Sequence, residues 1–216
     1  MKLVIANKAY SSWSFRPWIL MKALALPFEE EVIPLYQPDT ASRIARYSQA
    51  GRVPVLIDGD ITVWDSLSII EYLAETRPDL AVWPRDRAAR AHARSLSNEM
   101  HSGFVPLRAA LPMNMRRAPK PVPHDDDVDT AIDRICQAFV EARDRFGGTG
   151  AFLYGDFSAA DAMYAPVVSR FHGYAVPVPP AVKAYMEAVM ALPAWKEWHA
   201  GAMAEPWYEP RYDDMG

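Results

Sequence analysis

The chain has 216 residues, half of them hydrophobic and 23% charged, a composition typical of a folded globular protein rather than a disordered one. Its 23 basic and 27 acidic residues leave a net charge of −4. This charge argues against nucleic acid as the main partner, because nucleic-acid-binding domains are usually strongly basic. A single cysteine, Cys136, excludes an internal disulfide and a cysteine-rich zinc site.

The N-terminal apolar run ends at Asn7 and is too short for a signal-peptide core. No later stretch approaches the roughly 18 apolar residues that a membrane helix requires. We therefore expect a cytoplasmic protein without a membrane partner.

The first 77 residues alternate between strand and helix patterns. In chain order they predict a strand, a helix, a strand, a helix, a β-hairpin and a final helix. These elements cover residues 2–6, 16–25, 28–34, 40–47, 53–57 with 61–64, and a helix from residue 65 to about residue 76. The order is that of a compact α/β module.

The rest of the chain carries helical periodicity and no strand signal. Helices are predicted over residues 87–110, 126–146, 158–171, 180–192 and 194–203. The acidic run His124-Asp125-Asp126-Asp127 is interpreted as a helix cap rather than a metal site, because carboxylates favour a helix N-terminus. We therefore expect an α/β domain over residues 1–77, a linker over 78–84 and an all-α domain over 85–216.

Four motifs in order along the chain resemble the cytosolic glutathione transferase family. Ser11-Ser12-Trp13-Ser14-Phe15-Arg16 is similar to the Ser-Ser-Cys-Ser-x-Arg motif of the zeta class, with Trp13 in place of cysteine. Gly51-Arg52-Val53-Pro54 is similar to the segment before the family's cis-proline. Asp65-Ser66 with Ile69 and Glu71-Tyr72-Leu73 resembles the Glu-Ser-x-x-Ile-x-x-Tyr-Leu signature, and Ser158-x-x-Asp161 matches a capping motif of the α domain.

This resemblance implies the glutathione transferase fold, a thioredoxin-like α/β domain followed by an all-α domain. It also implies glutathione as a cosubstrate, with no metal. A free thiol has a pKa of about 8.5, so making thiolate dominant at neutral pH requires a shift of about two units, or roughly 2.7 kcal/mol. Hydrogen-bond donors at a helix N-terminus can supply this stabilisation.

The loop before the first helix is the expected place for those donors. Aligned with the zeta motif, Ser11 is the first candidate for stabilising the thiolate and Ser12 the second, whereas Ser14 is expected to cap the helix. Capping alone also explains serines at this position, since serine before a helix is common. Tyr10 is a further candidate, because some classes of the family use a tyrosine there. The replacement of cysteine by Trp13 weakens any transfer of zeta-specific isomerase chemistry.

Three further segments are expected to bind glutathione. The Val53–Pro54 bond is predicted to be cis, and the resemblance implies that Val53 pairs its main chain with the cysteinyl unit of glutathione; an edge-strand or turn proline is the alternative. Asp65 and Ser66 are expected to take the γ-glutamyl end at a helix N-terminus, although both also suit a plain cap. Arg52, or Gln49, is expected at the glycyl carboxylate.

Two other sets of residues are interpreted differently. Ser158 and Asp161 are interpreted as a capping box with a structural role. The acceptor pocket is expected to be apolar and adaptable, because aromatic and methionine surfaces fit varied shapes, although aromatic residues at helical spacing also suit a core. Its expected residues are Trp13, His101, Phe104, Arg108, Met113, Arg116, Trp207 and Tyr208.

The resemblance implies a glutathione S-transferase that attacks small hydrophobic electrophiles, as in detoxification. A zeta-like glutathione-dependent cis–trans isomerase and a non-catalytic binding or assembly protein are the alternatives. The family is usually homodimeric, and an arginine row at Arg87, Arg90 and Arg94 could pair across a two-fold axis with Glu71 or Asp86. A solvated arginine face is the other interpretation of this row.

Overall fold

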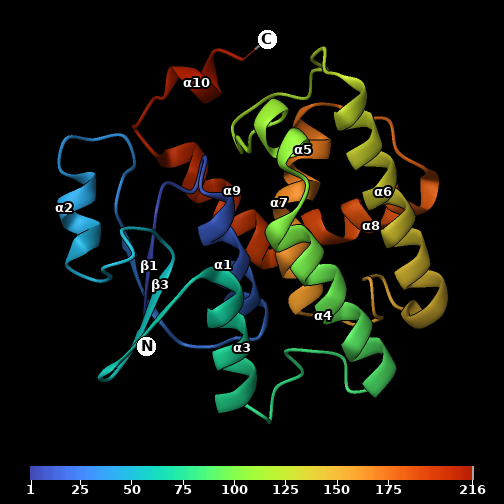
Figure 1. Cartoon of the computed structure of the whole chain (residues 1–216), viewed down its shortest axis with the longest axis horizontal. Coiled ribbons are helices and arrows are strands. Elements are labelled where there is room, and N and C mark those ends of the chain that lie inside the picture. The colour runs from blue at the N-terminus through green and yellow to red at the C-terminus, as the bar shows by residue number, and fades with distance from the viewer. Residues whose placement is uncertain (216) are drawn as a thin grey trace.

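The computed structural model describes residues 1–215 and contains the predicted α/β domain (Figure 1). Its sheet has the strand order β2-β1-β3-β4, in which β1 pairs parallel with β2 and antiparallel with β3, and β3 forms a hairpin with β4. The elements are β1 (Lys2–Ile5), α1 (Ser12–Ala23), β2 (Glu29–Val32), α2 (Thr40–Ala45), β3 (Val55–Asp58), β4 (Ile61–Trp64) and α3 (Ser66–Thr76).

Alternation along β1 explains why both faces of the sheet are covered. Leu3 and Ile5 join the large core shared with α1 and α3, whereas Val4 joins a small cluster with Ile33 and Ile44, the latter from α2. Successive side chains of a strand point to opposite faces, so this run of fully buried residues needs helices on both sides. The strand therefore lies at the centre of the domain, and its end carries the loop that leads to α1.

The second domain consists of helices joined by loops between residues 87 and 213, with two isolated β-bridges at residues 152–156. Its elements are α4 (Arg87–Ser102), α5 (Val105–Ala110), α6 (Asp126–Ala142), a π-helical turn (Arg143–Gly147), α7 (Ala159–Gly173), α8 (Pro180–Ala191), α9 (Pro193–Ala204) and α10 (Pro210–Asp213). The π-helical turn and α10 were not expected from the sequence.

The single helix predicted over residues 87–110 is wrong, because the chain breaks into α4 and α5. Phe104 adopts the left-handed conformation, with a φ of 57°, which a continuing right-handed helix excludes. Pro106 then lies in the first turn of α5, where its missing N–H costs nothing. This break separates α4 from α5.

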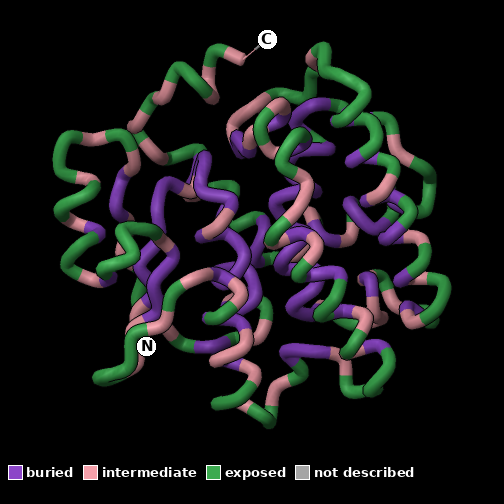
Figure 2. The backbone as a smooth tube through the Cα atoms, in the orientation of Figure 1, coloured by how far each residue is buried: buried purple, intermediate pink, exposed green. Residues whose placement is uncertain are grey.

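Helix α7 is the hub of the molecule, and almost all of it is buried (Figure 2). The predicted capping box at its start is confirmed: Asp161 accepts hydrogen bonds from the Ser158 N–H (2.9 Å) and hydroxyl (3.0 Å). It also accepts one from the Leu153 N–H at 3.0 Å. Burial raises the pKa of Asp161 to about 6, against these hydrogen bonds, which lower it. Because α7 packs on both α1 and α4, this cap supports the contact between the domains.

Two arginines of the row on α4 make hydrogen bonds within the chain. Arg94 donates two hydrogen bonds to Glu71 of α3, both at 3.0 Å, and Arg90 donates to the carbonyl oxygens of Pro84 and Arg85. The expected pairing of this row with Glu71 of a second copy is therefore wrong for Arg94, since that carboxylate is already paired. No helix among residues 1–215 is long and apolar enough to span a bilayer.

Candidate active site

A cavity of about 910 Å³ lies between the two domains, where β1 ends and α1 begins. It contains most of the residues that the sequence singled out. These are Ser11, Ser12, Trp13, Arg52, Val53, Pro54, Asp65, His101, Arg108 and Met113. The cavity lining also includes residues that the sequence did not indicate, notably Tyr36, Trp64, Arg170 and Tyr212.

The three serines of the first loop have different environments. Ser11 is the N-cap of α1, where its hydroxyl accepts from the Ser14 N–H at 3.3 Å and donates to Ser14 Oγ at 2.8 Å. Ser14 is fully buried, and its Oγ also accepts from the Ala6 N–H at 3.1 Å. The sequence-based prediction that Ser14 caps the helix is therefore wrong, because Ser11 is the cap. Ser14 also lies outside the cavity lining.

Ser12 is the first residue of α1 and lines the cavity. Within residues 1–215 its hydroxyl makes no hydrogen bond, whereas its N–H is bonded to the Tyr10 carbonyl at 2.9 Å. The hydroxyl of Ser12 can therefore turn toward a ligand without breaking a cap, and the N-terminal end of α1 adds a favourable field for an anion there.

Tyr10 is occupied elsewhere. Its hydroxyl donates to Asp213 and to the Trp207 carbonyl, and it accepts a hydrogen bond from Arg116. Burial and the bond to Asp213 raise the pKa of Tyr10. Tyr10 lines the cavity, but its hydroxyl is engaged in a polar network with Arg116, Trp207 and Asp213.

The Val53–Pro54 bond is cis, as predicted. Val53 and Pro54 line the cavity next to Arg52, whose side chain is exposed at the rim. The cavity thus has a backbone segment and a cation in the same lining as the serine loop, an arrangement that suits an extended peptide with a carboxylate at its end.

Asp65 is the N-cap of α3 and accepts from the Leu67 N–H at 2.9 Å. Its second oxygen lies 3.5 Å from Nε2 of His101, which comes from α4, so this pair crosses between the domains. Ser66 is fully buried and lies behind the cavity lining, and its Oγ has no hydrogen-bond partner within residues 1–215.

Arg108 and Arg170 line the cavity, and Arg16 contacts the lining residue Trp13. The guanidinium carbons of Arg16 and Arg108 lie 4.2 and 4.8 Å from the ring centre of Trp13. Arg170 of α7 is buried, lines the cavity and donates to the carbonyl oxygens of Leu111 and Pro166. Asp65 is the only acidic residue among the lining residues that the structure describes.

The two buried guanidinium groups have lowered pKa values, because burial and neighbouring positive charges both disfavour the charged form. Burial, and then the charges of Arg170 and Arg108, lower the pKa of Arg16 to about 9. Burial and then Arg108 lower the pKa of Arg170 to about 10. Nε and Nη1 of Arg16 also have no acceptor within residues 1–215. Uncompensated cations of this kind favour an anion in the cavity.

Four predicted acceptor residues lie outside the cavity lining. Arg116 and Trp207 belong to the polar network around Tyr10, and Phe104 and Tyr208 lie elsewhere. Phe104 packs its ring against the main core from its left-handed position before α5. Tyr208 is 61% exposed and donates its hydroxyl to Asp214. The C-terminal segment instead reaches the cavity through Tyr212.

Comparison with known proteins identifies the family. The model for the glutathione S-transferase N-terminal domain matches residues 10–76, and the model for the glutathione S-transferase C-terminal domain matches residues 125–201. The chain belongs to the glutathione S-transferase family.

The relatives of this glutathione S-transferase include isomerases. A maleylacetoacetate isomerase of Rattus norvegicus is 33% identical over 68% of this chain and 68% of its own length. A probable maleylacetoacetate isomerase of Caenorhabditis elegans is 39% identical, but over 45% of this chain and 48% of that protein. A glutathione transferase homologue from Burkholderia GL BGR1, solved with bound glutathione, has a TM-score of 0.72 at 25% identity and covers 94% of this chain and 98% of its own.

Sequence reasoning missed Arg170, Tyr36 and Tyr212 in this glutathione S-transferase for different reasons. Arg170 had a signal, because it is a charged residue in the mostly apolar stretch from Ala162 to Phe171. The two tyrosines had none, since they lie 176 residues apart and meet only through the tertiary structure.

Proposed function

We propose that this glutathione S-transferase binds glutathione in the cavity, ionises its thiol beside Ser12 and adds the thiolate to a small electrophile. The observation that carries the proposal is the Ser12 hydroxyl at the start of α1, which has no partner within residues 1–215 and lines the same cavity as the segment with the cis bond Val53–Pro54. A thiolate donor and a strand-like backbone wall in one cavity are what an activated tripeptide thiol requires.

Glutathione would lie across the cavity with its cysteinyl backbone along Val53. Its γ-glutamyl end would approach Asp65 and the N-terminal end of α3, with Ser66 behind them, and its glycyl carboxylate would approach Arg52. This pose uses the one acidic group of the lining for the α-amino group and leaves the arginines for anions.

Ser12 is the proposed thiolate donor and Ser11 the alternative. The hydroxyl of Ser11 is already used twice with Ser14, so turning it toward sulfur would cost part of the cap. One charge-assisted hydrogen bond contributes about 1.5–3 kcal/mol, which is of the size needed to lower the thiol pKa by one to two units.

The acceptor would combine an apolar part with a carboxylate. The sequence favoured a small hydrophobic electrophile, and Trp13 and Met113 offer it an apolar surface. Arg108 and Arg170 add two cations that pair with no acid within residues 1–215. A carboxylate on the acceptor would meet these guanidinium groups and relieve their mutual repulsion.

A glutathione-dependent cis–trans isomerase is the second candidate, and the arginines favour it. In that reaction the thiolate adds to one carbon of a carbon–carbon double bond and the π electrons move onto the neighbouring carbon or its carbonyl group. Rotation about the resulting single bond and expulsion of the same thiolate restore the double bond in the other geometry. The transferase and the isomerase thus share the thiolate step and differ in whether sulfur leaves. A non-catalytic binding role is disfavoured, because a scaffold needs neither the thiolate donor nor buried cations.

Two assays test the proposal. The protein should bind immobilised glutathione and conjugate it to an activated aryl halide, and it should be assayed in parallel with a maleyl-type cis-alkene acid. Conjugation without isomerisation supports the transferase, and isomerisation without consumption of glutathione supports the isomerase. Failure to bind glutathione would contradict both.

We further propose a cytoplasmic homodimer with a role in detoxification. The exposed face of α4 carries the small residues Ala88, Ala91 and Ser95, which allow close approach of a second helix. A light-scattering mass of one chain at micromolar concentration would contradict the dimer.

A further inference from the structure

Two tyrosines from distant parts of the chain meet at the opening of the cavity. Tyr36 lies in the loop before α2 and Tyr212 lies in α10, and both line the cavity. Their hydroxyl oxygens are 2.9 Å apart, and Tyr36 is 45% exposed. Figure 1 shows the C-terminal segment to the upper right of α2, and the hydroxyl contact brings it beside the loop that carries Tyr36. The contact thus bridges the two sides of the opening.

The Tyr212 side of this bridge is firmly held. Its ring stacks on Tyr10 with a centroid distance of 4.8 Å and an interplanar angle of 20°. The next residue, Asp213, pairs with Arg116 at 3.0 Å and accepts from Asn114 at 3.0 Å. Earlier in the segment, Glu205 accepts two backbone N–H groups of the first loop. Tyr212 is therefore fixed relative to the serine loop.

The loop that carries Tyr36 is held by hydrogen bonds of neighbouring residues. The Leu35 N–H donates to Asn7 Oδ1 at 2.7 Å, and the Thr40 hydroxyl donates to the Pro34 carbonyl at 2.6 Å. Tyr36 itself has a φ of 61°, a left-handed conformation that is unfavourable for a bulky residue and marks positions under functional constraint. Besides Tyr212, its ring contacts the guanidinium of Arg211 at 4.1 Å.

We propose that Tyr36 and Tyr212 form a gate that limits the length of the group carried on the glutathione sulfur. The proposal rests on the function proposed above, because it assumes that glutathione occupies the cavity. A short group fits behind the closed pair, whereas a long one projects between the rings and separates the hydroxyls. For a ligand that needs the open state, the apparent dissociation constant equals the intrinsic constant divided by the fraction of molecules that are open.

The test compares glutathione, S-methylglutathione and S-hexylglutathione by titration calorimetry. Tyr36→Phe and Tyr212→Phe each remove the same hydroxyl–hydroxyl bond and keep the ring. Each variant should bind S-hexylglutathione about two- to tenfold more tightly, the range that corresponds to one exposed hydrogen bond. The affinities for glutathione and S-methylglutathione should stay within about twofold of the wild-type values.

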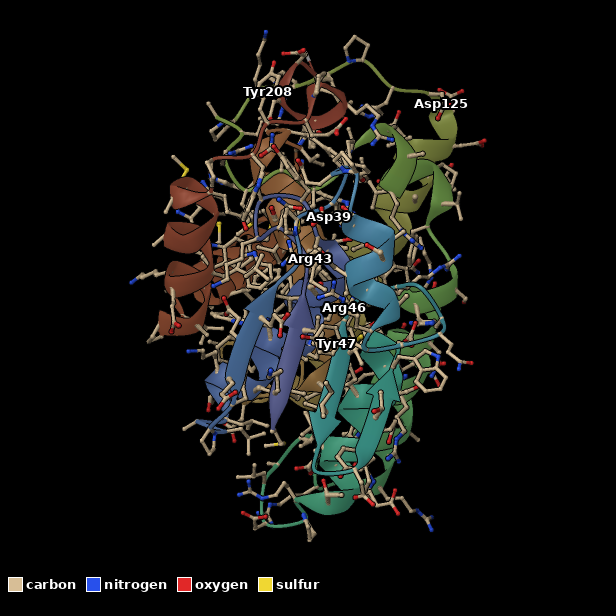
Figure 3. The ribbon with its side chains drawn as sticks, turned by 90° about the vertical axis from the view of Figure 1, so that its left-hand side faces the viewer. Asp39, Arg43, Arg46, Tyr47, Asp125 and Tyr208 are labelled. Carbon is tan, nitrogen blue, oxygen red and sulfur yellow. The ribbon has the colours of Figure 1, made fainter. Side chains whose placement is uncertain are left out.

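The double variant makes the test specific. Because both changes remove one bond, the double variant should gain no more affinity than either single variant. Tyr47→Phe is the matched control: its hydroxyl donates to Glu31 at 2.6 Å, and Tyr47 lies outside the cavity lining at the far end of α2 from Asp39 (Figure 3). This control should match the wild type with all three ligands.

Other outcomes overturn the gate. Unchanged S-hexylglutathione affinity in both single variants would show that the contact does not limit entry. Additive gains in the double variant would assign the effect to the greater apolarity of phenylalanine. Wild-type protein that binds none of the three ligands would instead contradict the proposed function and, with it, the gate.

Discussion

Tyr10 and Asp213 are 203 residues apart in sequence and share a hydrogen bond beside the candidate active site. Tyr10 directly precedes Ser11 and Ser12, and Asp213 is the last residue of α10. The same carboxylate accepts hydrogen bonds from Arg116, Asn114 and the Glu209 N–H. The C-terminal segment is therefore part of the support for the serine loop.

Replacing this carboxylate should loosen the C-terminal segment. Asp213→Asn leaves Arg116 without its counter-ion and should lower the free energy of unfolding by about 1–3 kcal/mol, measured by urea titration. Burial raises the pKa of Asp213, but the hydrogen bond from Tyr10, the other hydrogen bonds and the charge of Arg116 lower it by more. The net effect is a lowered pKa. The stabilisation should thus be present above the unfolded pKa of about 3.9 and be lost as the pH falls through the lower folded value. Asp214→Asn is the exposed control, and equal effects of the two changes would contradict this role.

Ser12→Ala should raise the pKa of the bound glutathione thiol. Loss of one charge-assisted hydrogen bond corresponds to about one to two pKa units, and the ultraviolet absorbance of the thiolate as a function of pH measures this shift. Ser11→Ala should instead lower the free energy of unfolding by about 1 kcal/mol, through loss of the cap of α1, with a smaller change in the thiol pKa. The reverse pattern would return the thiolate role to Ser11.

Arg108→Gln should separate acceptors by charge. The KM for a carboxylate-bearing acceptor should rise about tenfold or more, because a hydrogen bond to a charged group contributes about 1.5–3 kcal/mol. The KM for an uncharged aryl halide should change little. Arg145→Gln, on the exposed π-helical turn, serves as the control. An equal rise for both acceptors would indicate a packing defect rather than carboxylate recognition.

Asp161 should make stability depend on pH between about 4 and 6. Its pKa rises from about 3.9 in the unfolded chain to about 6 in the fold, so the folded protein binds the extra proton in this window. Its contribution is complete below the unfolded pKa and is lost as the pH rises through the folded pKa. The shift of about two units corresponds to roughly 2–3 kcal/mol.

Asp161→Asn should remove this part of the pH dependence. It should also lower stability by more than about 1 kcal/mol, because an amide cannot accept all the donors of the capping box. Urea titrations at several pH values measure both effects. An unchanged slope of stability against pH in this variant would assign the dependence to another group.

The sequence alone was sufficient for the order of domains and for features whose causes are local. The Ser158-x-x-Asp161 box could be predicted because its partners lie within one helical turn. The cis bond before Pro54 was predicted from the family motif, and the apolar run at residues 2–6 predicted the strand that the structure contains as β1. The break at Phe104 was missed, because a left-handed residue between two helical patterns leaves their periodicity intact.

The tertiary structure decided which side chains share the site. Ser11 and Ser12 are neighbours with the same hydroxyl, and the hydrogen bond from Ser11 to Ser14 distinguishes them. Arg170 reaches the cavity because α7 packs against α1, and Tyr36 meets Tyr212 because the C-terminal segment returns to the first domain. Local propensity acts over a few residues, whereas such contacts depend on packing between elements more than 100 residues apart in the chain, so no pattern in the sequence contains them.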